Sequence, residues 1–92
     1  MTQKTQMSVL RVLIERGWIS LRQLGILLEK PDRSIYGRQR GKNPVSTIRI
    51  GGVERVYTDA VVAELEESEL PSAKVILSVL KTGQKDKERQ DA

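Results

Sequence analysis

Two glycines at positions 51 and 52 separate two short runs in which β-branched and polar side chains alternate. The first run is Ser46-Thr47-Ile48-Arg49-Ile50, and the second is Val53-Glu54-Arg55-Val56-Tyr57. Alternation with period two is typical of a half-buried strand, and a Gly-Gly pair between two such runs favours a tight hairpin turn. The sequence therefore predicts one β-hairpin near the middle of this chain of 92 residues.

Most of the remaining sequence has the spacing of amphipathic helices. We predict helices over about 5–16, 21–29, 33–40, 59–67 and 72–82. Ser20 and Gln23 form a predicted capping box before the second helix, and Asp32 and Thr58 are expected to cap the third and the fourth. Gly17 is expected to end the first helix.

A chain of this length is expected to form a single domain. We place it at residues 1–83, with a core over 18–68, flanking helices over 5–16 and 72–82, and a disordered charged tail over 84–92 after Gly83. Trp18 and Ile19 are expected to form a short extended bridge, with Trp18 in the core. The predicted fold class is therefore mainly α with a small β-hairpin, in the order α-α-α-β-β-α-α.

The amino-acid composition argues against catalysis. The chain has no Cys and no His, so it lacks the preferred zinc ligands and cannot build a Ser-His or Cys-His nucleophile. We therefore expect no enzyme activity, no metal and no cofactor. No apolar run is long enough to span a membrane and no secretory signal is evident, so the expected location is the cytoplasm.

Charge is distributed unevenly along the sequence. Residues 30–57 carry seven basic and two acidic side chains, whereas residues 58–70 carry five acidic side chains and no basic one. A basic segment of this kind is the usual electrostatic signature of a nucleic-acid partner. The third predicted helix lies in this segment, and only Ile35, with part of Tyr36, can anchor it inward. Two linked helices followed by a basic hairpin predict a winged helix-turn-helix, in which the second helix of the pair enters the DNA major groove.

The segment from Ile19 to Leu65 resembles the small MerR-type winged helix of phage and mobile-element excisionases and AlpA-like regulators. The resemblance is carried by Ser20-Leu21-Arg22-Gln23-Leu24, Ser34-Ile35-Tyr36, Arg49-Ile50-Gly51-Gly52 and Thr58-Asp59-Ala60-Val61. The sequence departs from the family pattern at Gly25, where alanine is frequent, and at Glu29 and Lys30, where a glycine and an apolar residue are usual.

The resemblance implies a set of DNA-binding residues. Arg33, Ser34, Tyr36 and Arg38 would face the groove, with Gln39, Arg40 and Lys42 nearby, and Arg49, Gly51, Gly52 and Arg55 would approach phosphate or the minor groove from the hairpin. Tyr36 could equally be a packing residue, and the Gly-Gly pair could serve only as a turn.

The function that follows is sequence-specific binding of double-stranded DNA, with no chemistry of its own. By analogy with excisionases, the protein would bind repeated sites cooperatively, bend DNA, and direct a recombinase (integrase) or regulate transcription in a bacterial host cell. The alternative is an adaptor or anti-repressor whose basic patch binds an acidic protein. The last predicted helix either completes the core or joins copies of the chain; its apolar residues favour self-association, as a dimer or an array on DNA.

Overall fold

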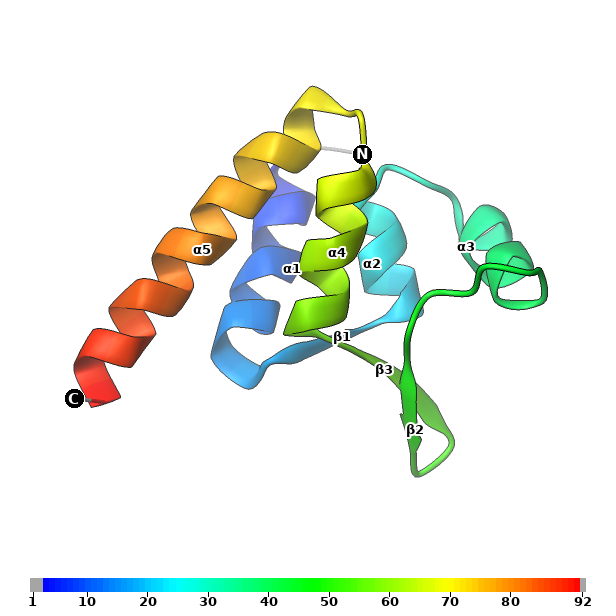
Figure 1. The fold of residues 1–92 in the computed structure, drawn as a ribbon, viewed down its shortest axis with the longest axis horizontal. Coiled ribbons are helices and arrows are strands. Elements are labelled where there is room, and N and C mark those ends of the chain that lie inside the picture. Colours follow the sequence, from blue (N-terminus) through cyan, green and yellow to red (C-terminus); the bar gives the residue numbers. More distant parts are fainter. Residues whose placement is uncertain (1–2, 92) are drawn as a thin grey trace.

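A computed structural model describes the backbone of residues 3–91 and the side chains of residues 5–83. Within this range the elements are α1 (Gln3–Arg16), β1 (Trp18–Ser20), α2 (Leu21–Leu27), α3 (Asp32–Gln39), β2 (Ile48–Ile50), β3 (Val53–Tyr57), α4 (Thr58–Glu67) and α5 (Pro71–Asp91). Helices α1, α2, α4 and α5 form the body, and α3 and the β2–β3 hairpin extend from it on one side (Figure 1). The predicted mainly helical fold with a small hairpin is confirmed.

The sheet has one more strand than the sequence predicts. The bridge at residues 18–20 is a strand, β1, and the antiparallel sheet has the order β1-β3-β2. Ile19 lies opposite Val56, and both side chains are fully buried. Burial of this pair explains why so short a segment joins the sheet. The hairpin turn is as predicted: Gly51 and Gly52 have φ of +58° and +79°, the left-handed values that a two-residue type I′ turn requires.

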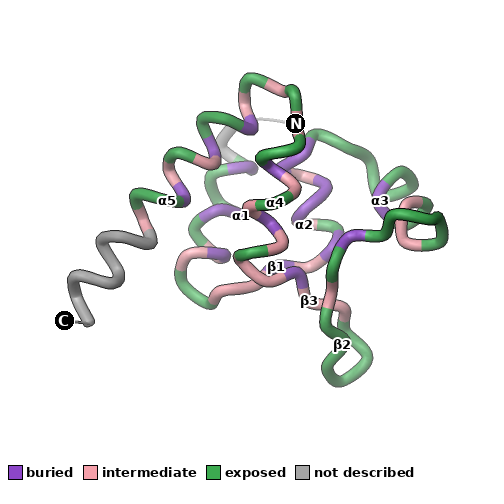
Figure 2. The backbone as a smooth tube through the Cα atoms, viewed as in Figure 1, coloured by how far each residue is buried: buried purple, intermediate pink, exposed green. Residues whose placement is uncertain are grey.

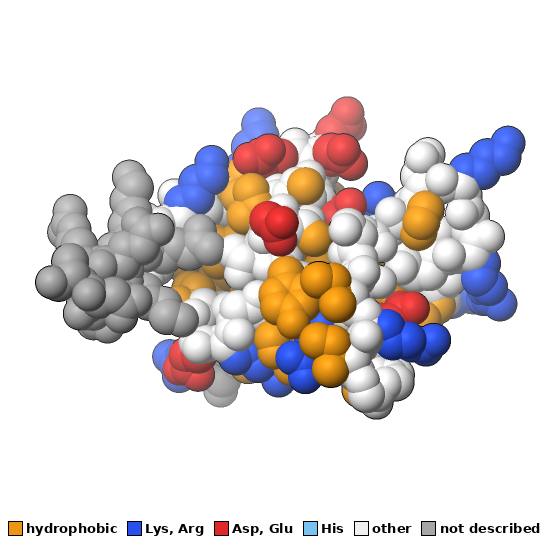
Figure 3. Space-filling model, turned by 60° about the horizontal axis from the view of Figure 1, so that its bottom comes forward, with side chains coloured by type: hydrophobic (Ala, Val, Ile, Leu, Met, Phe, Trp, Pro, Cys, Tyr) orange, Lys and Arg blue, Asp and Glu red, His pale blue; other side chains and the backbone are white. Residues whose placement is uncertain are grey.

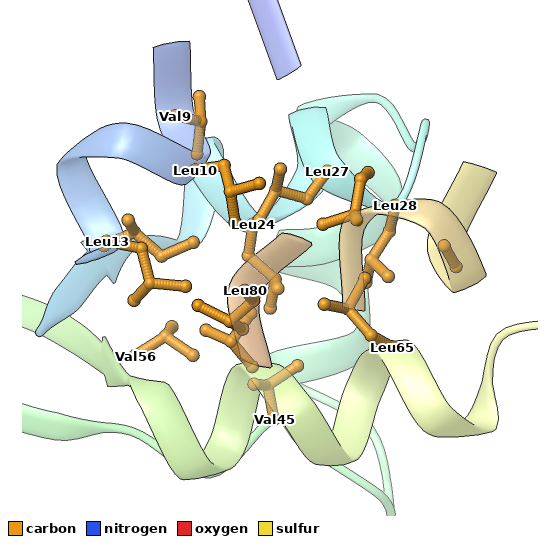
Figure 4. Close-up of a cluster of buried hydrophobic side chains, with 14 of the residues drawn as sticks. Val9, Leu10, Leu13, Leu24, Leu27, Leu28, Val45, Val56, Leu65 and Leu80 are labelled. Atoms are coloured by element: carbon orange, nitrogen blue, oxygen red, sulfur yellow. The ribbon is translucent and has the colours of Figure 1, made fainter. Parts of the chain in front are cut away.

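The core is aliphatic and draws on every helix. Leucines from α1, α2, α4 and α5 converge on it, together with Val56 of β3 and Val45 of the loop before β2 (Figure 4). Ala73, Ile76 and Leu80 of α5 are buried in the same cluster. Helix α5 therefore completes the core, and the self-association expected of it stays a prediction.

Of the three predicted N-terminal helix caps, one is confirmed and two are wrong. The Ser20–Gln23 capping box is confirmed, with the Gln23 amide donating to Ser20 Oγ at 3.2 Å and the Ser20 amide donating to Gln23 Oε1 at 2.9 Å. Asp32 and Thr58 are the first residues of their helices rather than caps, because Pro31 and Tyr57 occupy the cap positions without a side-chain hydrogen bond. The Thr58 hydroxyl instead donates to the Gly17 carbonyl at 3.1 Å, which ties the start of α4 to the end of α1.

Helix α5 runs further than predicted. It continues through Gly83 to Asp91, over residues such as Gln, Lys, Glu and Arg that have favourable helix propensity. Gly83 is not an end signal but a point of close approach to α1. A Cβ placed there would lie 2.7 Å from Cδ1 of Ile14.

Helix α2 ends in a Schellman motif built on a non-glycine residue. Glu29 has φ of +56°, its amide donates to the Ile26 carbonyl at 3.3 Å, and the Lys30 amide donates to the Gly25 carbonyl at 2.9 Å. Glu29 thus holds the position where glycine is usual in the resembling family. Its carboxylate accepts a hydrogen bond from the Ser72 hydroxyl at 2.9 Å, so the side chain links this turn to α5.

Gly25 lets α2 and the α2–α3 turn approach each other closely. A Cβ at this position would lie 2.9 Å from the Lys30 carbonyl oxygen and 3.1 Å from Cγ1 of Ile35. The backbone oxygen cannot move aside as a flexible side chain could. The departure from alanine at position 25 therefore has a steric reason.

We expect Gly25→Ala to lower the free energy of unfolding by about 1–2 kcal/mol, although glycine to alanine inside a helix normally raises it by up to about 1 kcal/mol. Gly37→Ala is the matched control, since a Cβ at Gly37 of α3 meets nothing within 4 Å. Urea denaturation of both variants measures the difference. Equal stabilisation by the two substitutions would contradict the close packing around Gly25.

Candidate nucleic-acid interface

Helix α3 is attached to the body along one side only. Within its eight residues, all of them described, Ile35 is the one buried side chain. Figure 2 shows this single buried position in a helix that is otherwise exposed or half-buried. The prediction that Ile35 is the main apolar anchor of α3 is confirmed, whereas Tyr36, expected to contribute in part, is not buried.

Arg38 is a second, polar anchor of α3. Its guanidinium forms a two-pronged ion pair with Glu64 of α4, in which Nη2 donates to Oε2 at 2.9 Å and Nη1 donates to Oε1. Its Nε donates to the Asn43 carbonyl at 2.9 Å. The hydrogen bond with Glu64 raises the pKa of Arg38 above its usual value. The sequence predicts that Arg38 faces a DNA groove. It faces the body instead, because its guanidinium nitrogens donate to Glu64 and to the Asn43 carbonyl.

Gln39 is the third anchor. Its side-chain amide donates to the Val45 carbonyl at 3.2 Å and accepts from the Val45 amide at 2.6 Å. This pair of hydrogen bonds fixes the loop between α3 and β2 and holds Val45 in the core. Gln39 therefore has a structural role, and its position near bound DNA stays a prediction.

The opposite side of α3 is free. Arg33, Tyr36 and Arg40 follow the helical spacing of three and four residues and, with Ser34, are exposed. Tyr36 exposes 46% of its surface, so it is partly covered, and the choice between a packing role and a phosphate contact stays open. Among the described residues, none makes a hydrogen bond or ion pair with the side chains of Arg33, Ser34, Tyr36 or Arg40.

An open groove of about 490 Å³ lies between α3 and the hairpin. It is lined by Tyr36, Gln39 and Arg40 on one side and by Arg49, Gly52, Val53 and Glu54 on the other, with Ser20 and Leu21. Arg49 and Glu54 lie opposite each other across the β2–β3 pair, so their side chains share the face of the hairpin that lines this groove. Exposed Lys42 lies in the loop that joins the two walls.

Arg55 lies on the other face of the hairpin, stacked on an aromatic ring. Its Cζ atom is 4.2 Å from the centre of the Trp18 ring, and Cζ of Arg16 is 3.6 Å from the same centre. Two guanidinium groups so close to one ring must cover opposite faces of it. Trp18 is half-buried, so the prediction that it belongs to the core is wrong: its ring is held at the outer face of the sheet by two cations.

The acidic residues lie elsewhere. A second groove, of about 580 Å³, is lined by Glu29, Glu64, Glu67 and Glu69, with Lys30 and the already paired Arg38. In Figure 3 acidic side chains gather at the upper edge, whereas basic ones project at the right edge, which carries α3. Unpaired basic side chains are therefore concentrated on the α3–hairpin side of the molecule, and acidic ones at the end of α4.

The structure divides the predicted site residues into two groups. The exposed group is Arg33, Ser34, Tyr36, Arg40, Lys42, Arg49, Gly51 and Gly52, of which Tyr36, Arg40, Arg49 and Gly52 line the α3–hairpin groove. The second group, Arg38, Gln39 and Arg55, makes internal contacts, although Gln39 also lines the groove. Helical spacing from Ile35 could have found Arg38 and Gln39, which lie three and four positions further on, on the inward side. Sequence reasoning missed Arg16, whose partner Trp18 is only two residues away.

Comparisons with protein-family models, curated proteins and solved structures found no match. Within the part of the chain that is described, no helix combines the length and hydrophobicity needed to cross a membrane. In the same residues, no three His, Cys, Asp or Glu side chains gather where they could hold a metal ion.

Proposed function

We propose that this protein binds double-stranded DNA as a winged helix-turn-helix, with α3 in the major groove and the β2–β3 hairpin as the wing. The observation that carries the proposal is the unpaired basic stripe of α3 beside a hairpin that extends from the body. A helix attached by three inward contacts can present its outer side without losing its position. The major groove, about 12 Å wide, admits one helix of this size.

The exposed residues have complementary roles in this arrangement. Arg33 and Ser34 lie in the first turn of α3, which is the part of a recognition helix that meets base edges. Arg40 and Arg49 line the two walls of the groove beside the hairpin and are suited to the phosphates of one strand. The glycines of the turn lack side chains, so the DNA backbone can approach them closely.

By the resemblance to excisionases, the biological outcome would be cooperative binding to repeated sites, with DNA bending that directs a recombinase or alters transcription. A protein of 92 residues gains affinity by occupying neighbouring sites together. Bending costs a few kcal/mol, which the added protein–DNA contacts must offset.

A gel-shift titration of DNA fragments that flank the protein's own gene, at several salt concentrations, tests this function. Stepwise complexes on one fragment, weakening steeply with salt, are the expected result. Absence of binding to every fragment, or binding to an acidic protein with weak salt dependence, would contradict it and support the adaptor alternative.

Arg40→Ala and Arg49→Ala are each expected to weaken binding to the preferred fragment about tenfold, because each removes a phosphate contact. The slope of log affinity against log salt should fall by about 0.9 for each. The matched controls are Arg11→Ala and Lys74→Ala, which remove the same charge from exposed positions on α1 and α5. An equal loss in the controls would show that net charge, and not this surface, determines binding.

A further inference from the structure

The hairpin exposes apolar side chains that the fold does not use. Ile48, Ile50 and Val53 expose 55%, 45% and 48% of their surfaces. Ile50 lies opposite Val53 and Ile48 lies opposite Arg55, so all four side chains project from the same face. Hydrophobic side chains gather beside basic ones in the view that brings this end of the molecule forward (Figure 3). A surface of this kind has a binding partner more often than isolated exposed residues do.

Two of these side chains form the outermost pair of the hairpin. Ile50 and Val53 flank the Gly51-Gly52 turn directly. A Cβ at either glycine would meet nothing within 4 Å, so the end of the hairpin is bare backbone. The end of the hairpin therefore consists of two residues without side chains, followed directly on each strand by the aliphatic pair Ile50 and Val53.

The hairpin is long enough to enter a DNA groove. Val56 is the last buried residue of β3, and Val53 lies three residues beyond it toward the tip. Three residues of strand span roughly 10 Å, whereas the minor groove of B-DNA is about 7.5 Å deep. The hairpin is therefore long enough for the apolar pair to reach base edges, and the minor groove, about 6 Å wide in B-DNA, must widen to admit its two strands.

The charges beside the pair favour DNA over an apolar protein surface. Arg49 lies next to Ile50 on the groove face, and Arg55 lies two residues from Val53 on the apolar face. Docking a hydrophobic protein on this face would remove the Arg55 guanidinium from water without giving it an anion. Insertion into DNA would place exposed Arg49 beside a phosphate while Arg55 stays on the Trp18 ring.

We propose that Ile50 and Val53 form a wedge that enters the minor groove and partly unstacks one base step, and that this wedge bends the bound DNA. The inference rests on the proposed DNA-binding function. Apolar wedges are a general means of kinking DNA, because the side chains replace part of the stacking that they disrupt. The contacts of α3 would determine where the protein binds, and the apolar pair would determine how far the DNA bends.

The test uses the full chain and the shortest fragment that it binds by gel shift. Donor and acceptor dyes at the two DNA ends report the bend, and 2-aminopurine placed at successive positions reports unstacking. The wild type should bring the ends together and raise 2-aminopurine fluorescence at one step. Ile50→Ser should bind within about threefold of the wild type but lose most of both signals.

Ile48→Ser is the matched control, since Ile48 lies on the same face, is the most exposed of the three, and is farther from the tip. It should retain both signals, and so should Ile50→Leu, which keeps an aliphatic group at the tip. If the wild type binds without bending, or Ile50→Ser bends DNA as the wild type does, the wedge is wrong and the apolar face is left for a protein. If the wild type does not bind DNA, the proposed function fails and the wedge fails with it.

Discussion

Ile35→Ala is expected to lower the free energy of unfolding by about 3 kcal/mol, the largest loss from a single side chain in α3. Ile35 is fully buried and packs against Gly25, so a smaller side chain leaves a cavity that the close α2–α3 contact cannot refill. Substitutions of buried Ile by Ala cost about 2–5 kcal/mol for this reason. Urea denaturation followed by circular dichroism measures the loss.

The loss should be concentrated in α3. Hydrogen exchange of the α3 amides should accelerate more than that of α1 and α5, because α3 then keeps only polar contacts, namely those of Arg38 and Gln39 and the exposed Asp32–Arg22 ion pair. Ile35→Val, which removes one methylene, should cost about 1 kcal/mol, and Ser34→Ala on the exposed side should change stability little. Equal acceleration in all helices of Ile35→Ala would show that α3 does not open as a separate unit.

Local signals in the sequence were sufficient for much of the fold. The Gly51-Gly52 turn, the Ser20–Gln23 capping box and the inward position of Ile35 each depend on residues at most four positions apart. Their physical causes are left-handed backbone, satisfied helix amides and helical spacing. All three features could therefore be predicted from the local sequence, without knowing how the rest of the chain folds.

The features that sequence reasoning missed depend on distant partners. Strand β1 is three residues long and exists because it pairs with β3, far along the chain. Arg38 differs from Arg40 in having the Asn43 carbonyl and the Glu64 carboxylate within reach, and Glu64 is supplied by another helix. Helical periodicity can assign Arg38 to the inward side of α3, but it cannot show that the Glu64 carboxylate lies beside it.

The same limit applies to the candidate site. A run of basic residues indicates that a polyanion could bind. The sequence pattern alone does not distinguish one arginine in the run from another. The structure separates arginines that hold the fold, Arg38 and Arg55, from those that remain available, Arg33, Arg40 and Arg49. Substitutions at the two groups should therefore have different consequences.

Arg38→Ala is the clearest case, and we expect it to lower the free energy of unfolding by about 2–3 kcal/mol. The Glu64 side chain is only 13% exposed, so removing its partner leaves a largely buried carboxylate without a cation and leaves the Asn43 carbonyl without a donor. Breaking a fully buried pair costs about 3–5 kcal/mol, and the lower value here follows from the 28% exposure of the Arg38 side chain. Thermal and urea denaturation measure the loss.

A double variant separates the cost of the orphaned carboxylate from other effects of the substitution. Arg38→Met combined with Glu64→Met should be at least about 1 kcal/mol more stable than Arg38→Met alone, because no unpaired charge remains. Under conditions where Arg38→Ala is folded, the salt dependence of its DNA binding should equal that of the wild type, whereas Arg40→Ala should lower the slope. If Arg38→Ala instead keeps full stability and lowers the salt slope as Arg40→Ala does, then Arg38 leaves Glu64 for a phosphate when DNA binds, and its ion pair is not needed to hold α3.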